Sequence, residues 1–347
     1  MIKGSATVAQ LPEFDEIIDV RSPAEFADDH LPGAINMPVL DDEQRARVGT
    51  IYKQVSPFEA RRLGGALVAE NLARHLFAHF QDKPRSWRPL VYCWRGGQRS
   101  GAFVTWLRMV GWDACQLVGG YKQFRRQVVD ELESRPAALD FRIVCGPTGS
   151  AKTRVLEALA GLGAQILDLE ALVAHKGSVL GGLPGVAQPS QKAFETQLHA
   201  RLKGFDPARP VFVEAESRKI GRLHVPGALI ERMRASPCVT IDASRDARIA
   251  FLLRDYAYLG DDAEALKFKL SCLQRLVSSA TLARWCEYAD RHDLPGLFAE
   301  LIDQHYDPLY RRSQNSNYLR YADAKRIETD DLSDAGIVEV AKRILEA

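Results

Sequence analysis

The segment PLVYCWRGGQRSGAF, residues 89–103, decides the fold of the first part of the chain. Its apolar start, from Leu90 to Tyr92, predicts a short buried strand, and its end predicts the beginning of a helix. A polar loop with two glycines joins the two elements. A buried strand that passes through such a loop into a helix is typical of α/β proteins, in which parallel strands alternate with helices.

A second segment, FRIVCGPTGSAKTRVLEALAGLG at residues 141–163, repeats the pattern of strand, glycine-bearing loop and helix. Further short apolar strands are predicted at residues 17–21, 164–168, 211–214 and 238–242, and helical spacing covers residues 43–80 and most of the chain after Arg245. The sequence therefore predicts an α/β fold in both halves, with a helical part toward the C-terminus.

The length and composition indicate two globular domains. A typical domain has about 150 residues, and the chain has 347. The segment VVDELESRPAALD, residues 128–140, combines the end of a helix with a proline and small residues, so the predicted domains are 1–135 and 136–347. With 46% hydrophobic and 26% charged residues, the chain lacks the bias of disordered, collagen-like or coiled-coil proteins.

The chain also lacks the marks of a membrane or secreted protein. No apolar run reaches the roughly 18 residues of a membrane helix, and acidic residues occupy the place where a signal peptide is apolar. The six cysteines form no CxxC pair, as expected of reduced thiols in the cytoplasm. The net charge of +1 neither shows nor excludes a nucleic-acid partner, because a local basic patch is enough to bind one.

The loop after the first strand is a candidate site for a nucleophilic cysteine. Cys93 stands at the end of the strand, where backbone N–H groups and a helix N-terminus favour an anion, here the thiolate. Arg95 and Arg99 would add positive charge for the thiolate and for an anionic donor. A buried structural cysteine is the alternative. The candidate anion-binding residues are Trp94, Arg95, Gly96, Gly97, Gln98 and Arg99.

The second loop, GPTGSAKT at residues 146–153, has the pattern of a phosphate-binding P-loop. Backbone amides and the helix dipole would bind a phosphate, Lys152 would add a charge, and Thr153 could hold Mg²⁺. Ala151 replaces the usual last glycine, and its Cβ is costly if the position needs a glycine-like conformation. This replacement affects nucleotide hydrolysis more than phosphate binding. The candidate phosphate-binding residues are Gly146, Thr148, Gly149, Ser150, Lys152 and Thr153, and a chance strand, loop and helix is the alternative.

Acidic residues near the second loop are candidates for a supporting role. Glu214 and Glu216 follow the strand VFVE and could supply the acid that a P-loop site uses, although a charged pair at a strand end is often simply solvated. Asp168 lies in the polar, glycine-bearing stretch DLEALVAHKGSVLGG, which could also be a surface loop.

Basic clusters after the later strands are candidates for binding RNA phosphates or for a solvated face balanced by acids. Arg218 and Lys219 are the candidates for contacts with RNA, and Arg245, Arg248 and Arg254 form a second cluster. His75 and His79 have the spacing of metal ligands, but no acid or cysteine joins them and an ordinary helix face is favoured. No metal site is therefore predicted from histidine or cysteine.

Three motifs in residues 8–130 resemble the rhodanese superfamily. They are DVRSPAEF from Asp19, HLPGAINMP from His30, and YCWRGGQRS from Tyr92. The resemblance implies that Cys93 carries a chalcogen as a persulfide or perselenide, with Asp19 and Arg21 in scaffold roles. The loop is C-x5-R, one residue longer than the usual single-domain rhodanese loop, and a longer loop fits a larger tetrahedral anion such as a phosphate-like donor.

The combination of this loop with GPTGSAKT makes the whole chain resemble the tRNA 2-selenouridine synthase family. LVGGYKQFR at residues 117–125, DLEALVAHKGSVLG at 168–181 and ESRKIG at 216–221 are further matches. The resemblance implies replacement of sulfur by selenium at C2 of 5-substituted 2-thiouridine in the tRNA wobble position, with selenophosphate as donor. It also implies an S-geranyl intermediate made from geranyl diphosphate, and selenium carried on Cys93 as selanyl-cysteine.

The same resemblance implies the partners of the chain. The P-loop would bind a diphosphate or a tRNA phosphate, with Mg²⁺ as its only candidate ion and no tightly bound cofactor. The tRNA anticodon arm already offers unpaired bases. We expect a cytoplasmic monomer.

Three other functions fit the motifs. A sulfurtransferase coupled to a P-loop NTPase or kinase would share both loops. A cysteine phosphatase would share C-x5-R, although Tyr92 stands where such enzymes usually have His and no general-acid Asp is evident. A non-catalytic module that senses anions with both loops is the third.

Overall fold

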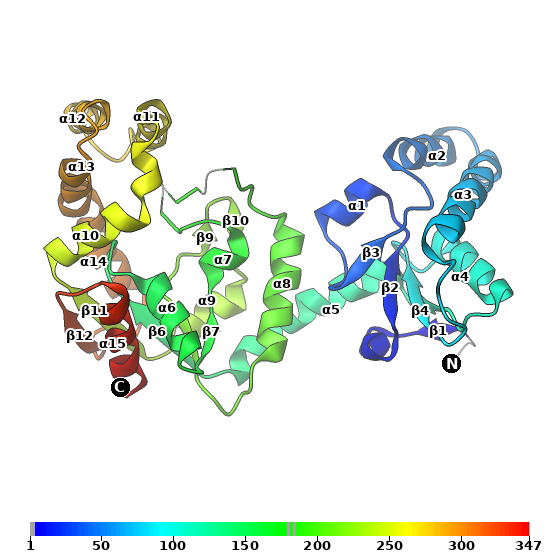
Figure 1. Cartoon of the computed structure of the whole chain (residues 1–347), viewed down its shortest axis with the longest axis horizontal. Helices are drawn as coiled ribbons and strands as arrows, with labels where there is room; N and C mark the ends of the chain where they lie inside the picture. Colours follow the sequence, from blue (N-terminus) through cyan, green and yellow to red (C-terminus); the bar gives the residue numbers. More distant parts are fainter. Residues whose placement is uncertain (1–3, 179–180, 183–184, 347) are drawn as a thin grey trace. The chain divides into compact units, whose positions relative to one another are not determined.

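The computed structural model describes residues 4–178, 181–182 and 185–346. It divides into two compact units, drawn in Figure 1, which are considered separately. Unit 1 comprises Met1–Glu131 with Ser190–His199, and unit 2 comprises Leu132–Pro189 with Ala200–Ala347. Within the described ranges, no helix is both long and apolar enough to span a bilayer.

Unit 1 is a five-stranded parallel sheet with helices, which confirms the predicted α/β class. Its strand order is β1-β5-β4-β2-β3, and β4 is central and buried at all four positions. The strands are β1 (Ser5–Ala6), β2 (Glu16–Asp19), β3 (Ala34–Asn36), β4 (Pro89–Tyr92) and β5 (Cys115–Leu117). The helices are α1 (Pro23–Asp28), α2 (Asp42–Gln54), α3 (Pro57–His79), α4 (Gln98–Val110) and α5 (Gly120–Ser134), with a 3-10 turn at Val8–Glu13.

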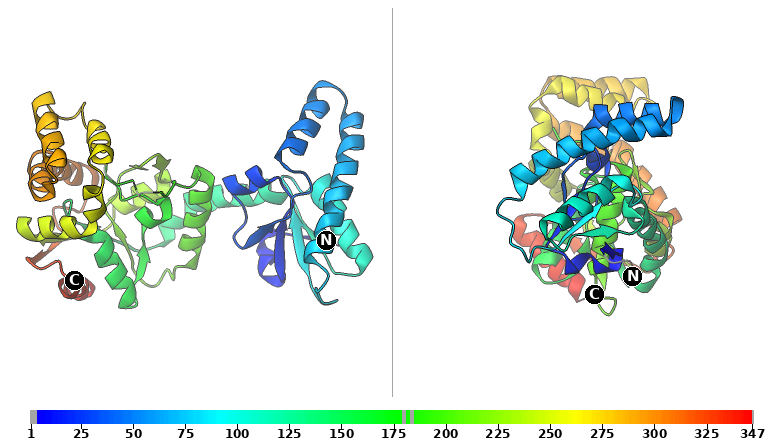
Figure 2. Two further views of the ribbon diagram at one scale, coloured as in Figure 1. Left: turned by 45° about the horizontal axis from the view of Figure 1, so that its top comes forward. Right: turned by 90° about the vertical axis from the view of Figure 1, so that its right-hand side faces the viewer.

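The helical pattern over residues 43–80 forms two helices, α2 and α3, instead of one. The hydroxyl of Ser56 accepts hydrogen bonds from the amides of Phe58 and Glu59, and Pro57 takes the first helical position. This N-cap starts α3 in a new direction. Figure 2 shows the resulting helical hairpin projecting from the sheet.

A buried ion pair fixes the end of β2. The Arg21 guanidinium donates to both Asp19 carboxylate oxygens, at 2.6–3.0 Å, and to the carbonyl of Asp29 at 2.6 Å. It also lies 4.0 Å from the centre of the Tyr121 ring. Both partners of the pair are almost fully buried. Asp19 and Arg21 therefore tie β2 to the start of α5.

Unit 2 is a second five-stranded parallel sheet, ordered β12-β11-β6-β8-β7, with a small antiparallel hairpin of β9 and β10. The strands are β6 (Phe141–Cys145), β7 (Gln165–Leu167), β8 (Val211–Glu214), β9 (Lys219–Ile220), β10 (Leu223–His224), β11 (Cys238–Ala243) and β12 (Lys325–Thr329). The helices are α6 (Lys152–Gly161), α7 (Leu169–Val173), α9 (Gly227–Arg234), α10 (Arg245–Asp255), α11 (Ala263–Ser271), α12 (Ser279–Asp290), α13 (Leu294–Leu301), α14 (Asp307–Asn317) and α15 (Asp334–Leu345). Helix α8 (Gln191–Gly204) belongs to unit 1 as far as His199 and to unit 2 from Ala200.

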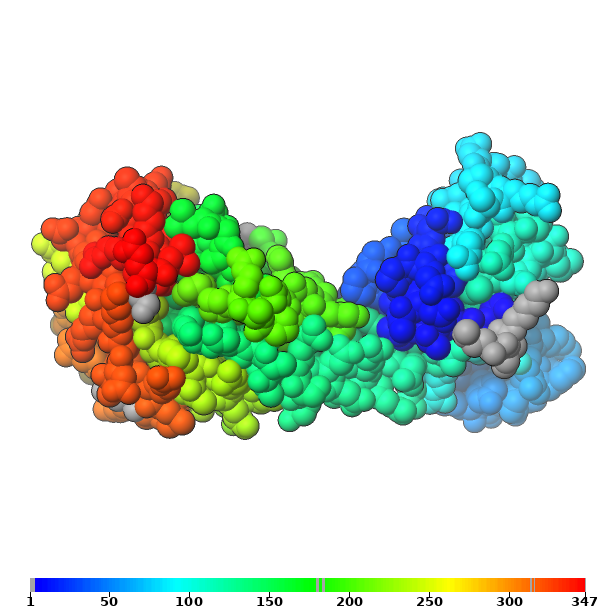
Figure 3. Space-filling model, turned by 90° about the horizontal axis from the view of Figure 1, so that it is seen from below, coloured from blue at the N-terminus to red at the C-terminus, as the bar shows by residue number. Residues whose placement is uncertain are grey.

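Unit 2 has two hydrophobic cores, one in its sheet part and one in its helical part. One core joins the sheet to α6 and α15, and a second lies among the helices around the fully buried Trp285. A π-helical turn at Ile302–Tyr306 links α13 to α14. The region after Arg245 is helical as predicted, except that β12 adds an edge strand beside β11. In the space-filling view, α15 (red) lies on the surface of unit 2 (Figure 3).

Asp19→Ala is expected to destabilise unit 1 by about 3–5 kcal/mol, because it leaves the buried Arg21 charge without its partner. Urea unfolding followed by tryptophan fluorescence measures the change. Asp82→Ala, in an exposed turn, is the control and should alter stability by less than about 0.5 kcal/mol. Equal stability of the two variants would contradict the assigned role of the pair.

Candidate functional site

Cys93 lies at the end of β4, where two donors converge on its sulfur. Sγ accepts a hydrogen bond from the amide of Gly97 at 3.3 Å and from the hydroxyl of Ser100 at 3.1 Å. The Gln116 side-chain amide donates to Ser100 Oγ at 2.8 Å, which leaves the hydroxyl hydrogen for the sulfur. The loop thus presents two hydrogen-bond donors to this sulfur.

The loop keeps its shape because the turn after β5 packs directly against it. The amide of Tyr121 donates to the carbonyl of Cys93, and the amide of Lys122 to the carbonyl of Trp94, both at 2.9 Å. A Cβ at Gly120 would lie 2.2 Å from the Cys93 carbonyl oxygen. A Cβ at Gly96 would lie 2.7 Å from the Leu117 carbonyl oxygen, and both glycines have positive φ. No other residue fits at either position.

The two arginines of the loop have different surroundings. Arg99 pairs with Glu25 at 2.8 Å; although burial acts in the opposite direction, this hydrogen bond and charge lower the pKa of Glu25. Arg95 is exposed. Trp94 packs its ring on Tyr121, with centroids 5.4 Å apart, and Gln98 begins α4. The groups that contact the sulfur are thus an amide and a hydroxyl.

The P-loop of unit 2 runs from the end of β6 into α6. Ala151 has φ +58° and is buried, so it adopts the left-handed conformation that is costly for alanine. Lys152 Nζ donates to the carbonyl of Gly146 at 3.0 Å, and Ser150 Oγ to that of Pro147 at 2.8 Å. A Cβ at Gly149 would approach the Arg248 carbonyl to 3.1 Å.

Two side chains from the helical part hold this loop. Arg248 donates to the carbonyl of Thr148 at 2.8 Å and pairs with Asp307 at 2.5 Å. The Tyr310 hydroxyl accepts from the amide of Gly146 at 2.5 Å. Arg248 is almost fully buried. Its assignment to a solvent-facing basic cluster was therefore wrong, because its charge is used inside the unit.

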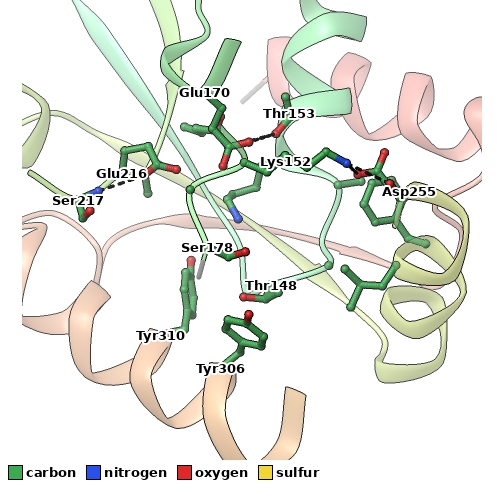
Figure 4. Close-up of a pocket in the computed structure, with 18 of the residues that line it drawn as sticks. Thr148, Lys152, Thr153, Glu170, Ser178, Glu216, Ser217, Asp255, Tyr306 and Tyr310 are labelled. Carbon is green, nitrogen blue, oxygen red and sulfur yellow. Dashed lines mark hydrogen bonds and ion pairs between the residues drawn. The ribbon is translucent and has the colours of Figure 1, made fainter. Parts of the chain in front are cut away.

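Three glutamates gather around Thr153. Carboxylate oxygens of Glu170, Glu214 and Glu216 lie within 4.8 Å of one another. Thr153 Oγ1 lies 3.1 Å from Glu170 Oε2 and 3.4 Å from Glu214 Oε2 (Figure 4). Within the described structure, Glu214 Oε1 is buried without a hydrogen-bond partner. The structure thus brings together the two predicted acids and adds Glu170, which the sequence reasoning left in a general polar stretch.

Asp168 positions this cluster without joining it. Its carboxylate accepts a hydrogen bond from the amide of Ala171 at 2.8 Å and so forms the N-cap of α7. The cap places Glu170 in the first turn of that helix. An Asp followed two residues later by a Glu at the start of a short helix was the available signal for Glu170.

The cluster is electrostatically strained without a cation. Burial, together with the charge of Glu216, raises the pKa of Glu170 to about 8. Burial raises the pKa of Glu216 to about 7. Burial and then the charge of Glu170 also raise the pKa of Glu214, while Lys152 acts in the opposite direction at all three groups. Carboxylates and a hydroxyl are the oxygen ligands that Mg²⁺ prefers.

A pocket of about 590 Å³ joins the P-loop to an apolar wall. On one side lie Lys152 and the glutamates, and on the other lie Tyr306 and Tyr310, with Thr148 between them (Figure 4). Leu276 and Leu309 belong to the same lining and are exposed to solvent. The pocket therefore offers an anion site beside a surface for an apolar group.

The remaining candidates make none of the contacts described for the loop of their own unit. Arg218 and Lys219 are exposed at and beside β9, outside this pocket lining. His75 Nε2 lies 2.9 Å from the carbonyl oxygen of Pro38, a structural contact. Among the described residues, neither His75 nor His79 joins a group with metal-ligand geometry.

The pKa values predict that, without divalent ions, unit 2 loses stability as pH rises from about 5 to about 8. The folded chain retains protons on Glu170 and Glu216 that the unfolded chain releases near their ordinary pKa of 4.5. Glu170→Gln should reduce this decline by about 1 kcal/mol per pH unit. Urea unfolding in chelator measures it, with the exposed Glu157→Gln as control. An unchanged slope in Glu170→Gln would show that Glu170 is ionised throughout.

Comparison with known proteins places the chain in a family. Residues 5–127 match the rhodanese-like domain, and residues 139–269 match the tRNA 2-selenouridine synthase AAA domain. The tRNA 2-selenouridine synthase of Alcanivorax borkumensis is 41% identical over 243 residues, covering 69% of this chain and 66% of that protein. That of Nitrosomonas europaea is 36% identical over 247 residues, covering 69% and 63%.

A longer match comes from Marinobacter nauticus. Its tRNA 2-selenouridine synthase is 35% identical over 323 residues, which cover 85% of this chain and 87% of that protein. The matched region thus spans just under two thirds of the first two relatives and most of the third. The chain belongs to the tRNA 2-selenouridine synthase family.

Proposed function

We propose that this protein replaces sulfur by selenium at C2 of a 5-substituted 2-thiouridine in the wobble position of tRNA, with selenophosphate as the donor. The observation that carries the proposal is the cradle around Cys93 Sγ, where the Gly97 amide and the Ser100 hydroxyl both donate to sulfur. We infer that the substrate is tRNA and that the transferred element is selenium from the names of the relatives.

Cys93 is proposed to carry selenium as selanyl-cysteine, with a bond from Sγ to selenium. A sulfur that accepts two hydrogen bonds at a helix N-terminus is suited to act as a thiolate nucleophile. The exposed Arg95 can attract an anionic donor to the loop. In this step Sγ attacks selenium as the Se–P bond of selenophosphate breaks, and phosphorus leaves with the bonding electron pair as phosphite, so no oxidant is needed. Delivery of the selenium to C2 as selenide then needs two electrons, which two thiols supply as they form a disulfide.

The P-loop pocket is proposed to bind geranyl diphosphate. The sulfur of the thiouridine attacks C1 of the geranyl group; the C–S bond forms as the C–O bond to diphosphate breaks, and the base loses its N3 proton. Selenium can then displace sulfur as geranyl thiolate, a better leaving group than sulfide. Amides at the start of α6 and Lys152 would hold the diphosphate, and the apolar wall supports a ligand with a hydrocarbon chain.

Mg²⁺ fits the residues of this pocket. Thr153 and the three glutamates would hold it, and the buried Glu214 Oε1 without a partner is an open ligand position in the described structure. When bound, the ion would neutralise charge on the diphosphate leaving group.

A P-loop NTPase or kinase is the second candidate activity, favoured by the same acid cluster, and nucleotide turnover without tRNA would identify it.

Cys93→Ala is expected to lower selenium incorporation into tRNA at least 100-fold, because the carrier sulfur is lost, while S-geranylation continues at unit 2. Nucleosides from tRNA incubated with selenophosphate and geranyl diphosphate, each omitted in turn, are measured by mass spectrometry. Cys115→Ala, also buried in unit 1, is the control. Full selenium incorporation by Cys93→Ala would rule out a selanyl-cysteine intermediate.

Leu309→Asp is expected to weaken geranyl diphosphate binding about tenfold, since a leucine contact contributes roughly 1.5 kcal/mol. Inorganic diphosphate should lose much less affinity, because it loses no apolar contact and is affected only by repulsion from the added carboxylate. Titration calorimetry with both ligands measures the effect. Leu319→Asp, exposed and outside the pocket lining, is the control, and Lys152→Ala should weaken both ligands. If Leu309→Asp weakens both ligands equally, the apolar wall does not hold the chain.

A further inference from the structure

Unit 1 has a second feature beside the cysteine loop, a cavity of about 320 Å³ under the hairpin of α2 and α3. One wall is the first turn of α4, with Gln98 and Arg99. These two residues are also the last two of the C-x5-R loop that begins at Cys93. Val48 and Tyr52 of α2 and Arg61 and Gly65 of α3 form the opposite walls. A ligand in this cavity would therefore lie next to the proposed selenium carrier.

The outer part of the hairpin, residues 44–69, is here called the hairpin tip and is basic in a chain whose net charge is only +1. It contains one acidic residue, Glu59, and five basic residues: Arg45, Arg47, Lys53, Arg61 and Arg62. Arg45 pairs with Glu25 and Arg62 with Glu59, whereas among the described residues the other three form no ion pair. Such a concentration of basic residues is typical of a surface that binds a polyanion.

The same tip exposes large apolar side chains between its basic residues. Tyr52 is 57% exposed, Val55 72% and Phe58 63%. They lie at and beside the turn that joins α2 to α3. Exposed aromatic rings interleaved with arginines are typical of surfaces on which unpaired bases stack while their phosphates are neutralised.

Gly65 provides an independent indication of a ligand. Glycine inside a helix destabilises it relative to alanine, so its presence in α3 calls for a packing reason. At the neighbouring Gly64 a Cβ would come within 3.3 Å of Val48 in α2, so helix packing explains that glycine. A Cβ at Gly65 would meet nothing within 4 Å. The space that Gly65 leaves belongs to the cavity.

We infer that the hairpin tip and this cavity bind the anticodon loop of the tRNA substrate. An unpaired base enters the cavity between Tyr52 and Gly65, its edge toward Gln98, while backbone phosphates lie along the arginines of the tip. Bases of single-stranded loops are recognised by aromatic stacking and by hydrogen bonds to their edges. The inference rests on the proposed function and assigns to unit 1 a tRNA surface separate from Arg218 and Lys219.

A binding measurement with paired variants tests this surface. The ligand is a synthetic anticodon stem-loop containing 2-thiouridine, and the full-length protein is used. The double variant Tyr52→Ala and Phe58→Ala should bind it about tenfold more weakly, the effect of losing roughly one stacked base. Phe77 is also in α3, its ring is 79% exposed, and it does not line this cavity. Phe77→Ala should therefore bind the stem-loop like the wild type.

Gly65→Ala separates binding from folding. It should raise the thermal midpoint, as alanine favours a helix, and yet weaken RNA binding severalfold by filling the cavity. Gly161→Ala, at the end of α6 in unit 2, where a Cβ would likewise meet nothing within 4 Å, should leave RNA binding unchanged. Geranyl diphosphate binding should be unaffected in every one of these variants.

The outcomes are distinct. Wild-type RNA affinity in both Gly65→Ala and the double aromatic variant would overturn this surface, even if the wild type modifies tRNA as proposed. A change of oligomeric state in the double variant, with RNA binding intact, would also overturn it and identify a contact between copies of the chain. If the wild type neither binds the stem-loop nor modifies tRNA, the proposed function fails together with the inference.

Discussion

The hydrogen bond from the Tyr121 amide to the Cys93 carbonyl fixes the cysteine loop, and the chemistry of unit 1 depends on it. The bond requires Gly120 to approach that carbonyl more closely than any side chain permits. On its other side, Tyr121 packs under the Arg21 guanidinium, which the buried Asp19 holds in place. The ion pair thus supports the loop through an aromatic ring, and the loop in turn aims the Gly97 amide and Ser100 hydroxyl at sulfur.

The charges around the P-loop of unit 2 have the opposite sign to what the cysteine loop offers. The cysteine loop presents donors to an anion, whereas the three glutamates around Thr153 crowd like charges into a buried space. Burial and mutual repulsion raise the pKa values of these carboxyl groups, so their ionised forms are unfavourable unless a cation neutralises them. A ligand that arrives with Mg²⁺ would satisfy both the amides and the carboxylates. Arg248 and Tyr310, from the helical part, hydrogen-bond to the backbone of the P-loop. Because Tyr310 also lines the pocket, these contacts fix the position of the apolar wall relative to the anion site.

Much of this arrangement was predictable from short patterns, and the failures have physical causes. The central strands β4 and β6 and their loops were readable because each is a short, mainly apolar run followed by a loop with glycines; only Arg142 in β6 is charged. β12 was missed because only one of its five residues is fully buried and it pairs on one side alone. Glu170 was not singled out because its role depends on α7 folding back to Thr153, a contact between residues 17 positions apart. Arg248 was misjudged because composition cannot show that a charge is buried against Asp307.

The distribution of paired charges explains how a nearly neutral chain can bind RNA. Arginines beside the two loops looked available in the sequence, yet several of them are used in ion pairs. Arg99 is held by Glu25, Arg245 by Asp303 and Arg248 by Asp307. Acidic residues thus cancel basic ones mainly where the fold needs fixed geometry. At the tip of the α2–α3 hairpin, Arg45 and Arg62 are also paired, but within the described structure Arg47, Lys53 and Arg61 form no ion pair. The charge that remains for a polyanion is therefore concentrated beside Cys93, where an anticodon loop would have to bind for its wobble base to receive selenium.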